Sequence, residues 1–158
     1  MKNTRLLVTN ALIAAVYAAW TILMAPISYG AIQARLSEIM VFLAFYNKKF
    51  IPGLAIGCIL ANIPSSLGVI DMVFGTISTI LVCFAMYYLP NRYAGAVAGG
   101  IITGLIIGFE LHMVFQLPFI ISALEVFAGE VAVLVIGAMI FGLIERNSGV
   151  MNYIKDKD

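Results

Sequence analysis

Six apolar runs divide this chain, and their length restricts it to a membrane-spanning helical bundle. Crossing the hydrocarbon core of a bilayer takes roughly 20 apolar residues in a helix. The runs cover residues 6–25, 31–46, 50–62, 70–89, 94–115 and 119–144, and segments rich in Pro, Asn, Ser and Gly separate them. We therefore expect an all-α integral membrane protein, a bundle of six transmembrane helices in a single domain over residues 1–158. The second and third runs are short for full spans and are expected to be tilted, extended into their loops or partly re-entrant.

Composition supports the membrane class and excludes others. Hydrophobic residues make up 63% of the chain and charged residues 11%, whereas soluble domains carry about a quarter charged residues. The net charge of +1 leaves no basic face for nucleic acid. Cys58 and Cys83 stand singly inside apolar runs, which predicts neither a disulfide framework nor a metal site.

The basic residues predict the orientation. If six helices alternate in direction, eight of the nine Lys and Arg residues fall on one side: Lys2, Arg5, Lys48, Lys49, Arg92, Arg146, Lys155 and Lys157. Basic residues concentrate in cytoplasmic loops. We therefore expect both termini in the cytoplasm. A count of five or seven helices would scatter these charges over both sides.

Small residues recur at four-residue spacing, which lets helix backbones approach closely in lipid. The glycines Gly53 and Gly57, and the series Gly100, Gly104 and Gly108, are expected to pack within the bundle. The alanines of the first helix leave two alternatives open, internal packing or a docking face for another membrane subunit. They are Ala11, Ala15 and Ala19, with Ala14 and Ala18 beside them.

Ionisable residues inside the bilayer are costly and point to function. At 1.5 Å per residue, an acidic cluster falls in the outer half of the bundle, with its deepest member, Glu130, roughly 16 Å from the outer end of its helix. The candidate binding residues are Gln33, Arg35, Glu38, Asn62, Asp71, Glu110 and Glu130. Glu125, His112 and Gln116 lie in the same layer. This layer predicts a polar cup that is open outward, closed below, and suited to a ligand that is cationic or rich in N–H donors.

Each of these residues also has a structural explanation. Arg35 and Glu38, three apart on one helix, could neutralise each other, and Asp71 could stabilise a helix N-terminus. His112 is expected to be a solvated ring. Glu110 and Glu130 have no basic residue within reach on their own helices. They are protonated, or share Arg35, or receive donors from a ligand.

Two rival functions belong to other classes. An ion-driven carrier working alone would need a polar route on both sides of the midplane, and the sequence lacks one. An intramembrane enzyme would need a nucleophile–histidine or metal pattern, and the single histidine provides none. The chain also lacks the Gly-x-x-x-x-Gly-Lys motif that cradles ATP phosphates. We therefore expect no catalysis and no cofactor in this chain.

The sequence resembles the S-components of energy-coupling factor (ECF) transporters, and more closely the QueT family, assigned to the uptake of queuosine precursors. The resemblance covers roughly residues 6–143. Its most specific stretch is Ala-Pro-Ile-Ser-Tyr-Gly-Ala-Ile-Gln-Ala-Arg-Leu-Ser-Glu at 25–38, followed by 57–62, 71–75, 108–111 and Gly129-Glu130. Ala34 departs from the bulkier residue expected at its position.

The resemblance implies a six-helix protein of the bacterial cell membrane that captures a vitamin-like solute on the outer side. It further implies docking through an Ala-x-x-x-Ala surface of the first helix onto a transmembrane coupling subunit driven by two ATPases, which use the ATP. Queuosine precursors are deazaguanine-type bases whose N1–H and exocyclic amine are donors, and an aminomethyl form adds a cation. Glu38, Glu110 and Glu130 would then be suitable acceptors, with Asn62, Asp71 and Gln33 closing the mouth.

Overall fold

The structure is a computed structural model that describes residues 2–28 and 35–155, with side chains described for residues 4–26 and 35–155. This part of the chain is helical and contains no strand. In chain order the elements are α1 (Lys2–Leu23), α2 (Ala25–Ser28), the 3₁₀ helix η1 (Leu36–Val41), α3 (Phe42–Tyr46), the 3₁₀ helix η2 (Lys48–Phe50), α4 (Ile51–Asn62), α5 (Val69–Tyr88), α6 (Arg92–Phe115), α7 (Phe119–Ile144) and α8 (Ser148–Lys155).

Four helices are long and apolar enough to cross a membrane, and they match four of the six predicted spans. They comprise Thr4–Leu23, Val69–Tyr88, Arg92–Phe115 and Phe119–Ile144. The other two predicted spans are shorter, an apolar helical stretch over Leu36–Tyr46 and the 12 residues of α4. The prediction of a multi-span helical protein therefore holds, while the count of six spans stays a prediction.

The chain between α1 and α3 differs from the predicted pattern. α1 ends at Leu23, and Ala25–Ser28 form a separate helical turn because Pro26 lacks the N–H that a continuing helix requires. The second helix was expected to begin at residue 31, but Arg35 is extended (φ −85°, ψ 97°) and η1 begins at Leu36. Residues 31–34 lie outside the described part of the chain. The 3₁₀ geometry, seen in the bond from the Glu38 N–H to the Arg35 carbonyl (2.9 Å), brings residues three apart onto one side.

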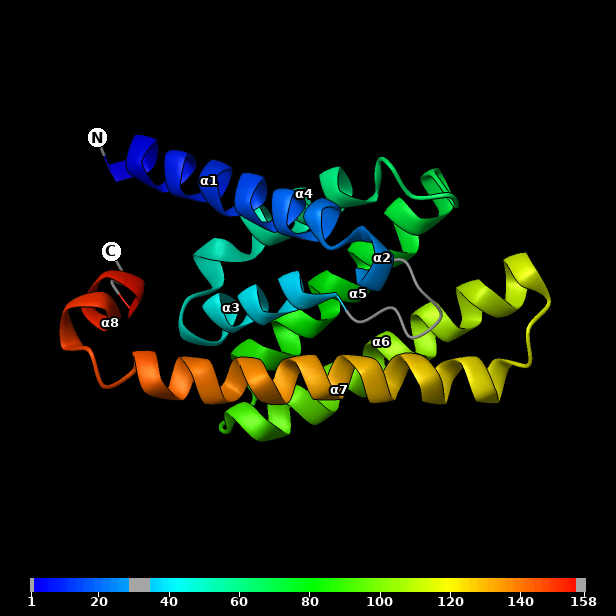
Figure 1. The fold of residues 1–158 in the computed structure, drawn as a ribbon. Coiled ribbons are helices and arrows are strands. Elements are labelled where there is room, and N and C mark those ends of the chain that lie inside the picture. The colour runs from blue at the N-terminus through cyan, green and yellow to red at the C-terminus, as the bar shows by residue number, and fades with distance from the viewer. Residues whose placement is uncertain (1, 29–34, 156–158) are drawn as a thin grey trace.

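The helices run between two ends of an elongated bundle (Figure 1). We call the end that holds residues 2, 47–50, 89–92 and 145–155 the terminal end, and the end that holds the turns 63–68 and 116–118 the turn end. Both described chain ends therefore lie at the same end as the Lys48–Lys49 turn and Arg92. This is the grouping that the distribution of basic residues predicted.

An apolar core fills the terminal half of the bundle. Leu54, Met86 and Leu134 are fully buried there, and Phe42 of α3 stacks on Phe141 of α7 with ring centroids 5.7 Å apart. Trp20 of α1 is half-buried and packs against the same core. The terminal half is therefore held mainly by side-chain packing.

Glycines allow the closest helix contacts, as the small-residue spacing predicted. A Cβ at Gly108 of α6 would lie 2.7 Å from Cα of Ala123, and one at Gly104 would lie 2.8 Å from the carbonyl oxygen of Ala123 in α7. On the other side of the bundle, a Cβ at Gly57 of α4 would lie 2.8 Å from Cβ of Tyr17 in α1. The backbones of α6 and α7 are thus in direct contact, as are those of α1 and α4.

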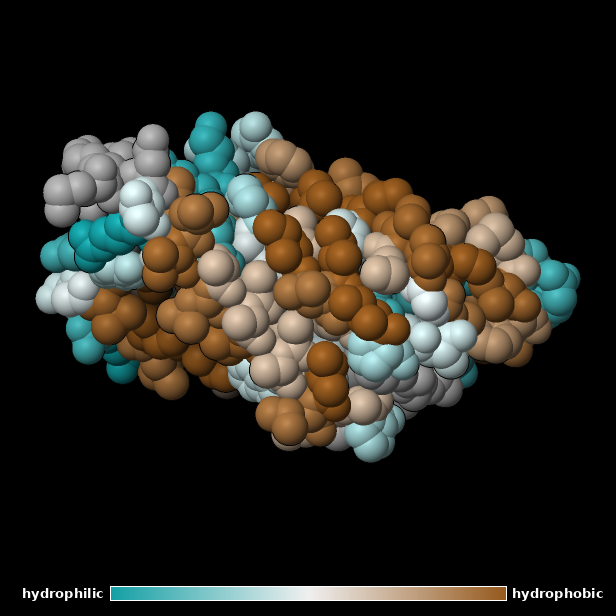
Figure 2. Space-filling view, turned by 90° about the horizontal axis from the view of Figure 1, so that it is seen from above, coloured by the Kyte–Doolittle hydropathy of each residue, from teal (hydrophilic) through white to brown (hydrophobic). Residues whose placement is uncertain are grey.

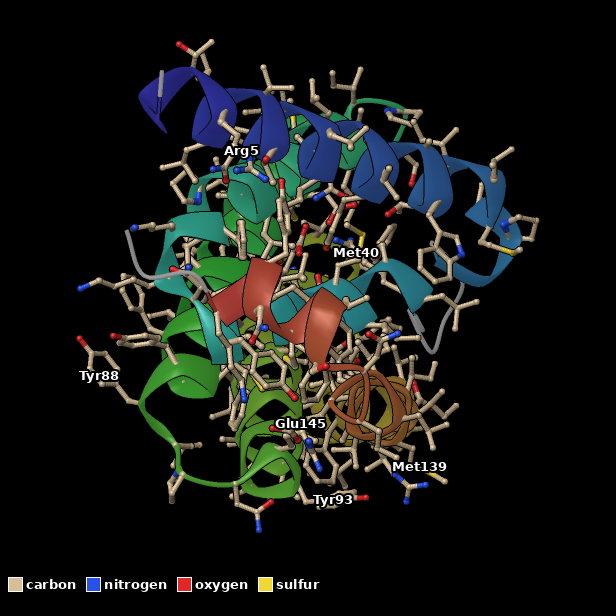
Figure 3. All side chains as sticks on the ribbon, turned by 90° about the vertical axis from the view of Figure 1, so that its left-hand side faces the viewer. Arg5, Met40, Tyr88, Tyr93, Met139 and Glu145 are labelled. Atoms are coloured by element: carbon tan, nitrogen blue, oxygen red, sulfur yellow. The ribbon has the colours of Figure 1, made fainter. Side chains whose placement is uncertain are left out.

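Helix α8 lies across the terminal end of the bundle, with Glu145 close beneath it (Figure 3). Asn147 caps its start, because its side chain accepts hydrogen bonds from the backbone N–H groups of Gly149 and Val150 (3.1 and 3.4 Å). Met151 and Ile154 are its buried residues. No helix was predicted here, although an Asn cap followed by apolar residues three apart is a helix signal.

Apolar side chains cover much of the outer surface. Figure 2, which looks down on the face that carries α1, shows hydrophobic residues over most of that face and the strongly hydrophilic ones toward the ends. Exposed apolar residues occur on each of the four long helices, for example Leu12, Ile77, Leu105 and Ile136. Such a surface fits lipid rather than water.

Candidate functional site

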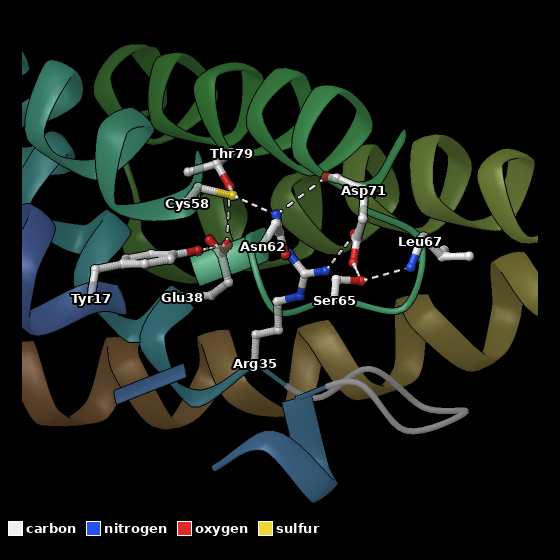
Figure 4. Close-up of polar contacts among 9 residues, drawn as sticks. All are labelled: Tyr17, Arg35, Glu38, Cys58, Asn62, Ser65, Leu67, Asp71 and Thr79. Carbon is white, nitrogen blue, oxygen red and sulfur yellow. Dashed lines mark hydrogen bonds and ion pairs between the residues drawn. The ribbon is translucent and has the colours of Figure 1, made fainter. Parts of the chain in front are cut away.

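A buried ion pair lies at the centre of the polar layer in the turn half (Figure 4). Nη2 of Arg35, which precedes η1, lies 2.8 Å from Oδ1 of Asp71 in α5. The second oxygen of Asp71 accepts a hydrogen bond from the Ser65 hydroxyl (2.5 Å), and the backbone carbonyl of Asp71 accepts one from Nδ2 of Asn62 (3.2 Å). The ion pair of Arg35 therefore reaches across to α5, rather than to Glu38 three residues away, which was the alternative that the sequence left open.

Glu38 of η1 is held by two hydroxyl groups from different helices. Oε1 of Glu38 accepts hydrogen bonds from the hydroxyl of Tyr17 in α1 and from the hydroxyl of Thr79 in α5, the latter at 3.0 Å. Its other oxygen, Oε2, is buried and has no hydrogen-bond partner among the described residues. Glu38 therefore has one oxygen anchored by the bundle and one free to accept.

Gly75 makes room for this network. A Cβ at this position of α5 would lie 2.7 Å from Nδ2 of Asn62 and 3.2 Å from Nη1 of Arg35. Any larger side chain would therefore displace the guanidinium or the amide. This explains why a glycine stands in the middle of a long apolar helix, where it otherwise costs helix stability.

A small cavity opens beside this network. It measures about 10 Å³ and is lined by residues of four elements, Arg35, Glu38, Gly75, Ser78, Thr79, Thr103, Ile107, Val126 and Glu130. Helical periodicity accounts for the set, because residues three or four apart share a face. Val126 and Glu130 share one face of α7, and Thr103 and Ile107 share one face of α6.

Two further carboxyl groups are buried without a full set of partners. Both oxygens of Glu110, and Oε1 of Glu130, have no hydrogen bond within the described residues. Glu130 lines the cavity but Glu110 does not, although Glu110 follows Thr103 and Ile107 along α6 at helical spacing. Unpaired buried polar groups carry a desolvation cost, so these oxygens are candidates to accept hydrogen bonds from a ligand.

The remaining predicted polar residues separate into two groups. Gln33 lies outside the described residues. His112, Gln116 and Glu125 are exposed, and Nδ1 of His112 lies 2.6 Å from the carbonyl oxygen of Leu117. The structure thus places Arg35, Glu38, Asn62, Asp71, Glu110 and Glu130 inside the bundle and these three residues on its surface.

Several hydroxyl groups of the network were not predicted. Tyr17 and Thr79 contact Glu38, Ser65 contacts Asp71, and the Ser78 hydroxyl donates to that of Thr103 (3.1 Å). Hydroxyl groups in apolar helices often bond to their own backbone, as Thr21 does to the Tyr17 carbonyl (2.9 Å). Their positions in the sequence therefore do not distinguish a network member from a helix-bonded side chain.

The alanines of α1 lie on two faces. Ala14 and Ala18 are buried, and a Cβ on Gly57 would lie 3.1 Å from Cα of Ala14. Ala11, Ala15 and Ala19 are exposed. The first pair therefore packs inside the bundle, and the stripe of three faces outward.

Comparisons with known proteins agree with this picture. A curated relative, the queuosine precursor transporter QueT of Lactococcus lactis subsp. cremoris (strain MG1363), is 34% identical over 150 residues, which cover 85% of this chain and 88% of the relative. No solved structure matches the chain. The matching relative and family are transporters, which agrees with the prediction that the chain is not an enzyme. Together with the four long apolar helices, this match makes the chain a multi-pass membrane protein. Because the QueT transporter family model matches residues 7–146, nearly the whole sequence, this chain belongs to the QueT transporter family.

Proposed function

We propose that this chain is the substrate-binding S-component of an ECF-type importer of the bacterial cell membrane, and that it binds a queuosine precursor in the polar layer of its turn half. The observation that carries the proposal is the set of four carboxyl groups and one arginine buried inside an otherwise apolar bundle, namely Arg35, Glu38, Asp71, Glu110 and Glu130. Charges buried in a membrane protein are rarely tolerated except for function. The family and the name of the curated relative supply the substrate class.

The chemistry of the free oxygens fits a deazaguanine-type base. Such a base presents N1–H and an exocyclic amine as donors. Oε2 of Glu38, both oxygens of Glu110 and Oε1 of Glu130 are buried acceptors without a described partner, and an ionised carboxylate accepts hydrogen bonds but donates none. The ligand would supply the hydrogen bonds that the protein lacks.

The rest of the transport cycle would need partners. The terminal end is assigned to the cytoplasm because basic residues gather there. In the described terminal half no Asp, Glu, Lys, Arg or His is buried, so a polar solute has no route through the bundle to that side. We therefore assign release to a transmembrane coupling subunit and two ATPases, with the exposed stripe Ala11, Ala15 and Ala19 as the docking face.

Ligand identity tests the proposal directly. Mass spectrometry of the purified chain should detect a deazaguanine-type base, and calorimetry in detergent should show that base binding again. Glu110→Gln exchanges an acceptor oxygen for a donor and should weaken binding about 10-fold or more. Glu145→Gln, at the terminal end, should leave affinity unchanged. A purified chain that transports the base into liposomes without ATPases would instead identify a self-sufficient carrier.

A matched pair of variants tests the docking face. Ala15→Leu adds bulk to the exposed stripe and should abolish co-purification with a coupling subunit while ligand binding survives. Ala14→Leu adds the same bulk against α4 and should destabilise the fold itself. If Ala15→Leu keeps the partner bound, the exposed stripe is not the docking face.

Cysteine labelling tests the orientation. Cys58 and Cys83 are buried, so a membrane-impermeant thiol reagent should leave the wild type unlabelled in intact cells. Ser66→Cys at the turn end should label from outside, and Lys48→Cys at the terminal end should not. Labelling of Lys48→Cys would reverse the assigned orientation.

A further inference from the structure

The cavity beside Glu38 is much too small for a deazaguanine ring. It measures about 10 Å³, which is the space needed for roughly one water molecule. If the polar layer binds a queuosine precursor, as proposed above, the ring lies outside this cavity as the structure stands. Only a terminal group about the size of one water molecule can enter it.

The cavity lining is rich in hydrogen-bond acceptors, and the one basic residue among its described members is already paired with Asp71. Oε2 of Glu38 and Oε1 of Glu130 are buried and unpartnered among the described residues. The hydroxyls of Ser78, Thr79 and Thr103 add further oxygens. Arg35 also lines the cavity, but its guanidinium is engaged by Asp71 at 2.8 Å. Two carboxyl groups therefore share the cavity without a base of their own.

A cationic group would satisfy this lining better than a neutral donor. A neutral N–H donates to a carboxylate but leaves its charge uncompensated, and buried charges are stable only when paired. An alkylammonium group is about the size of water, carries one positive charge and has three N–H donors. A metal ion fits less well, because no three His, Cys, Asp or Glu side chains within the described ranges are grouped to hold one.

We propose that this cavity is a subsite for an alkylammonium group carried by the transported base, with Glu38 and Glu130 as the residues that select it. The inference rests on the proposed function and goes one step further, because it names which forms of the base are preferred. Forms with an aminomethyl substituent place their nitrogen in the cavity. Forms whose substituent is neutral leave both carboxyl groups unpaired.

Two ligands of nearly equal shape test the subsite. Calorimetry in detergent would compare 7-aminomethyl-7-deazaguanine with 7-hydroxymethyl-7-deazaguanine, its neutral counterpart. Wild-type protein should bind the amine at least about 10-fold more tightly than the alcohol, because a hydrogen bond between charged partners changes the affinity by about this factor. Glu130→Gln should reduce this ratio to about threefold or less. Glu125→Gln is the matched control, because Glu125 is exposed on the same helix, and it should keep the wild-type ratio.

The outcomes separate the two proposals. If neither ligand binds, the proposed function fails. If wild-type protein binds both equally, or Glu130→Gln weakens both by the same factor, the base binds but the ammonium subsite is wrong. Should Glu130→Gln fail to fold, the wild-type ratio alone decides. Replacing Na⁺ with choline should leave the ratio unchanged, and loss of affinity for both ligands without Na⁺ would place a metal ion in the cavity instead.

Discussion

In the terminal half of the bundle, Leu54, Met86 and Leu134 are fully buried among other apolar side chains, whereas in the turn half Asn62, Asp71 and Glu38 are almost as deeply buried and carry polar or charged groups. The buried side chains of the two halves are therefore stabilised in different ways. Close packing suffices for the first set, because its members have no polar atoms to satisfy. Each member of the second set depends on hydrogen-bond or ion-pair partners from neighbouring elements, and removing one partner leaves a buried polar or charged group less well compensated.

This difference teaches where specificity resides. An apolar core tolerates swaps of similar volume. A buried ion pair with hydrogen bonds does not, since removing one member leaves an uncompensated charge. The turn half is therefore less tolerant of substitution. Glu38, Glu110 and Glu130 also have buried oxygens there without a hydrogen-bond partner among the described residues. Four substitutions measure how far the two halves differ.

Arg35→Met should have the largest effect. It leaves Asp71 buried at the end of a broken ion pair, which costs about 3–5 kcal/mol of unfolding free energy. Chemical unfolding in detergent micelles measures the loss, and ligand affinity should fall with it. The double variant Arg35→Met with Asp71→Asn removes the orphaned charge and should recover part of the stability. Equal stability of the single and double variants would show that Asp71 does not depend on Arg35.

Leu134→Ala tests the apolar half at a comparable depth. Leu134 packs against α6, where a Cβ at Gly99 would lie only 2.6 Å from its Cδ1, so truncation leaves a void and should cost about 2 kcal/mol or more. Calorimetry on the folded fraction should still show wild-type ligand affinity. A large loss of affinity would mean that the two halves are not independent.

Tyr17→Phe removes one hydroxyl and keeps the ring. It takes one donor from Oε1 of Glu38 and leaves the Thr79 hydroxyl in place, so we expect a loss of about 1.5 kcal/mol. Thr79→Val is the companion variant and should lose a similar amount by the same unfolding measurement. Wild-type stability in both would show that Glu38 does not need these hydroxyls.

Glu145→Gln at the terminal end should have the smallest effect. Glu145 is paired with Arg92 and Lys155 but its side chain is 39% exposed, and exposed ion pairs contribute about 1 kcal/mol or less. Partial burial acts to raise the pKa of Glu145, but the hydrogen bonds from Arg92 and Lys155 outweigh it and hold that pKa below its usual value of 4.5.

The sign of the pH dependence follows from that lowered pKa. The stabilisation by the Glu145 carboxylate is fully present above the pKa of the unfolded chain and is lost as the pH falls through the lower pKa of the folded chain. The difference in Tm between wild type and Glu145→Gln should therefore be constant above about pH 4.5 and shrink below it. A difference that grows on acidification would contradict this pairing.

The long helices could be predicted because turn residues bound their apolar runs. The predicted 119–144 coincides with α7, whose start follows Pro118. The predicted 94–115 lies within α6, which Asn91 caps by accepting from the N–H of Tyr93 (2.8 Å). α8 was not predicted, because a short helix carries few periodic residues. Within the predicted 31–46, the late start at Leu36 and the 3₁₀ form of η1 were not predicted, because η1 depends on contacts with α1, such as the Thr21–Ser37 hydroxyl pair (2.6 Å).

The burial of the charged residues of the candidate site could be predicted from the sequence, but their pairing could not. Acidic residues stand out in apolar runs because placing them in a bilayer costs free energy. The structure buries Glu38, Glu110 and Glu130 and exposes Glu125. The sequence left the partner of Arg35 open, with Glu38 on its own helix as one alternative, and the ion pair is with Asp71 of α5. Which helix faces which is decided by packing across 36 residues of sequence, and no local pattern records it.

Trp20 makes the packing of α1 observable by fluorescence. It is the chain's single tryptophan, and it lies on α1 beside Thr21, one turn from the Tyr17 that contacts Glu38. Tryptophan emission from the unmodified protein therefore reports the surroundings of α1 alone. Because its indole packs against the apolar core, a shift in its emission on adding ligand would signal that α1 has changed its packing. Constant emission in a sample whose ligand binding is measured by calorimetry would signal that α1 keeps its packing.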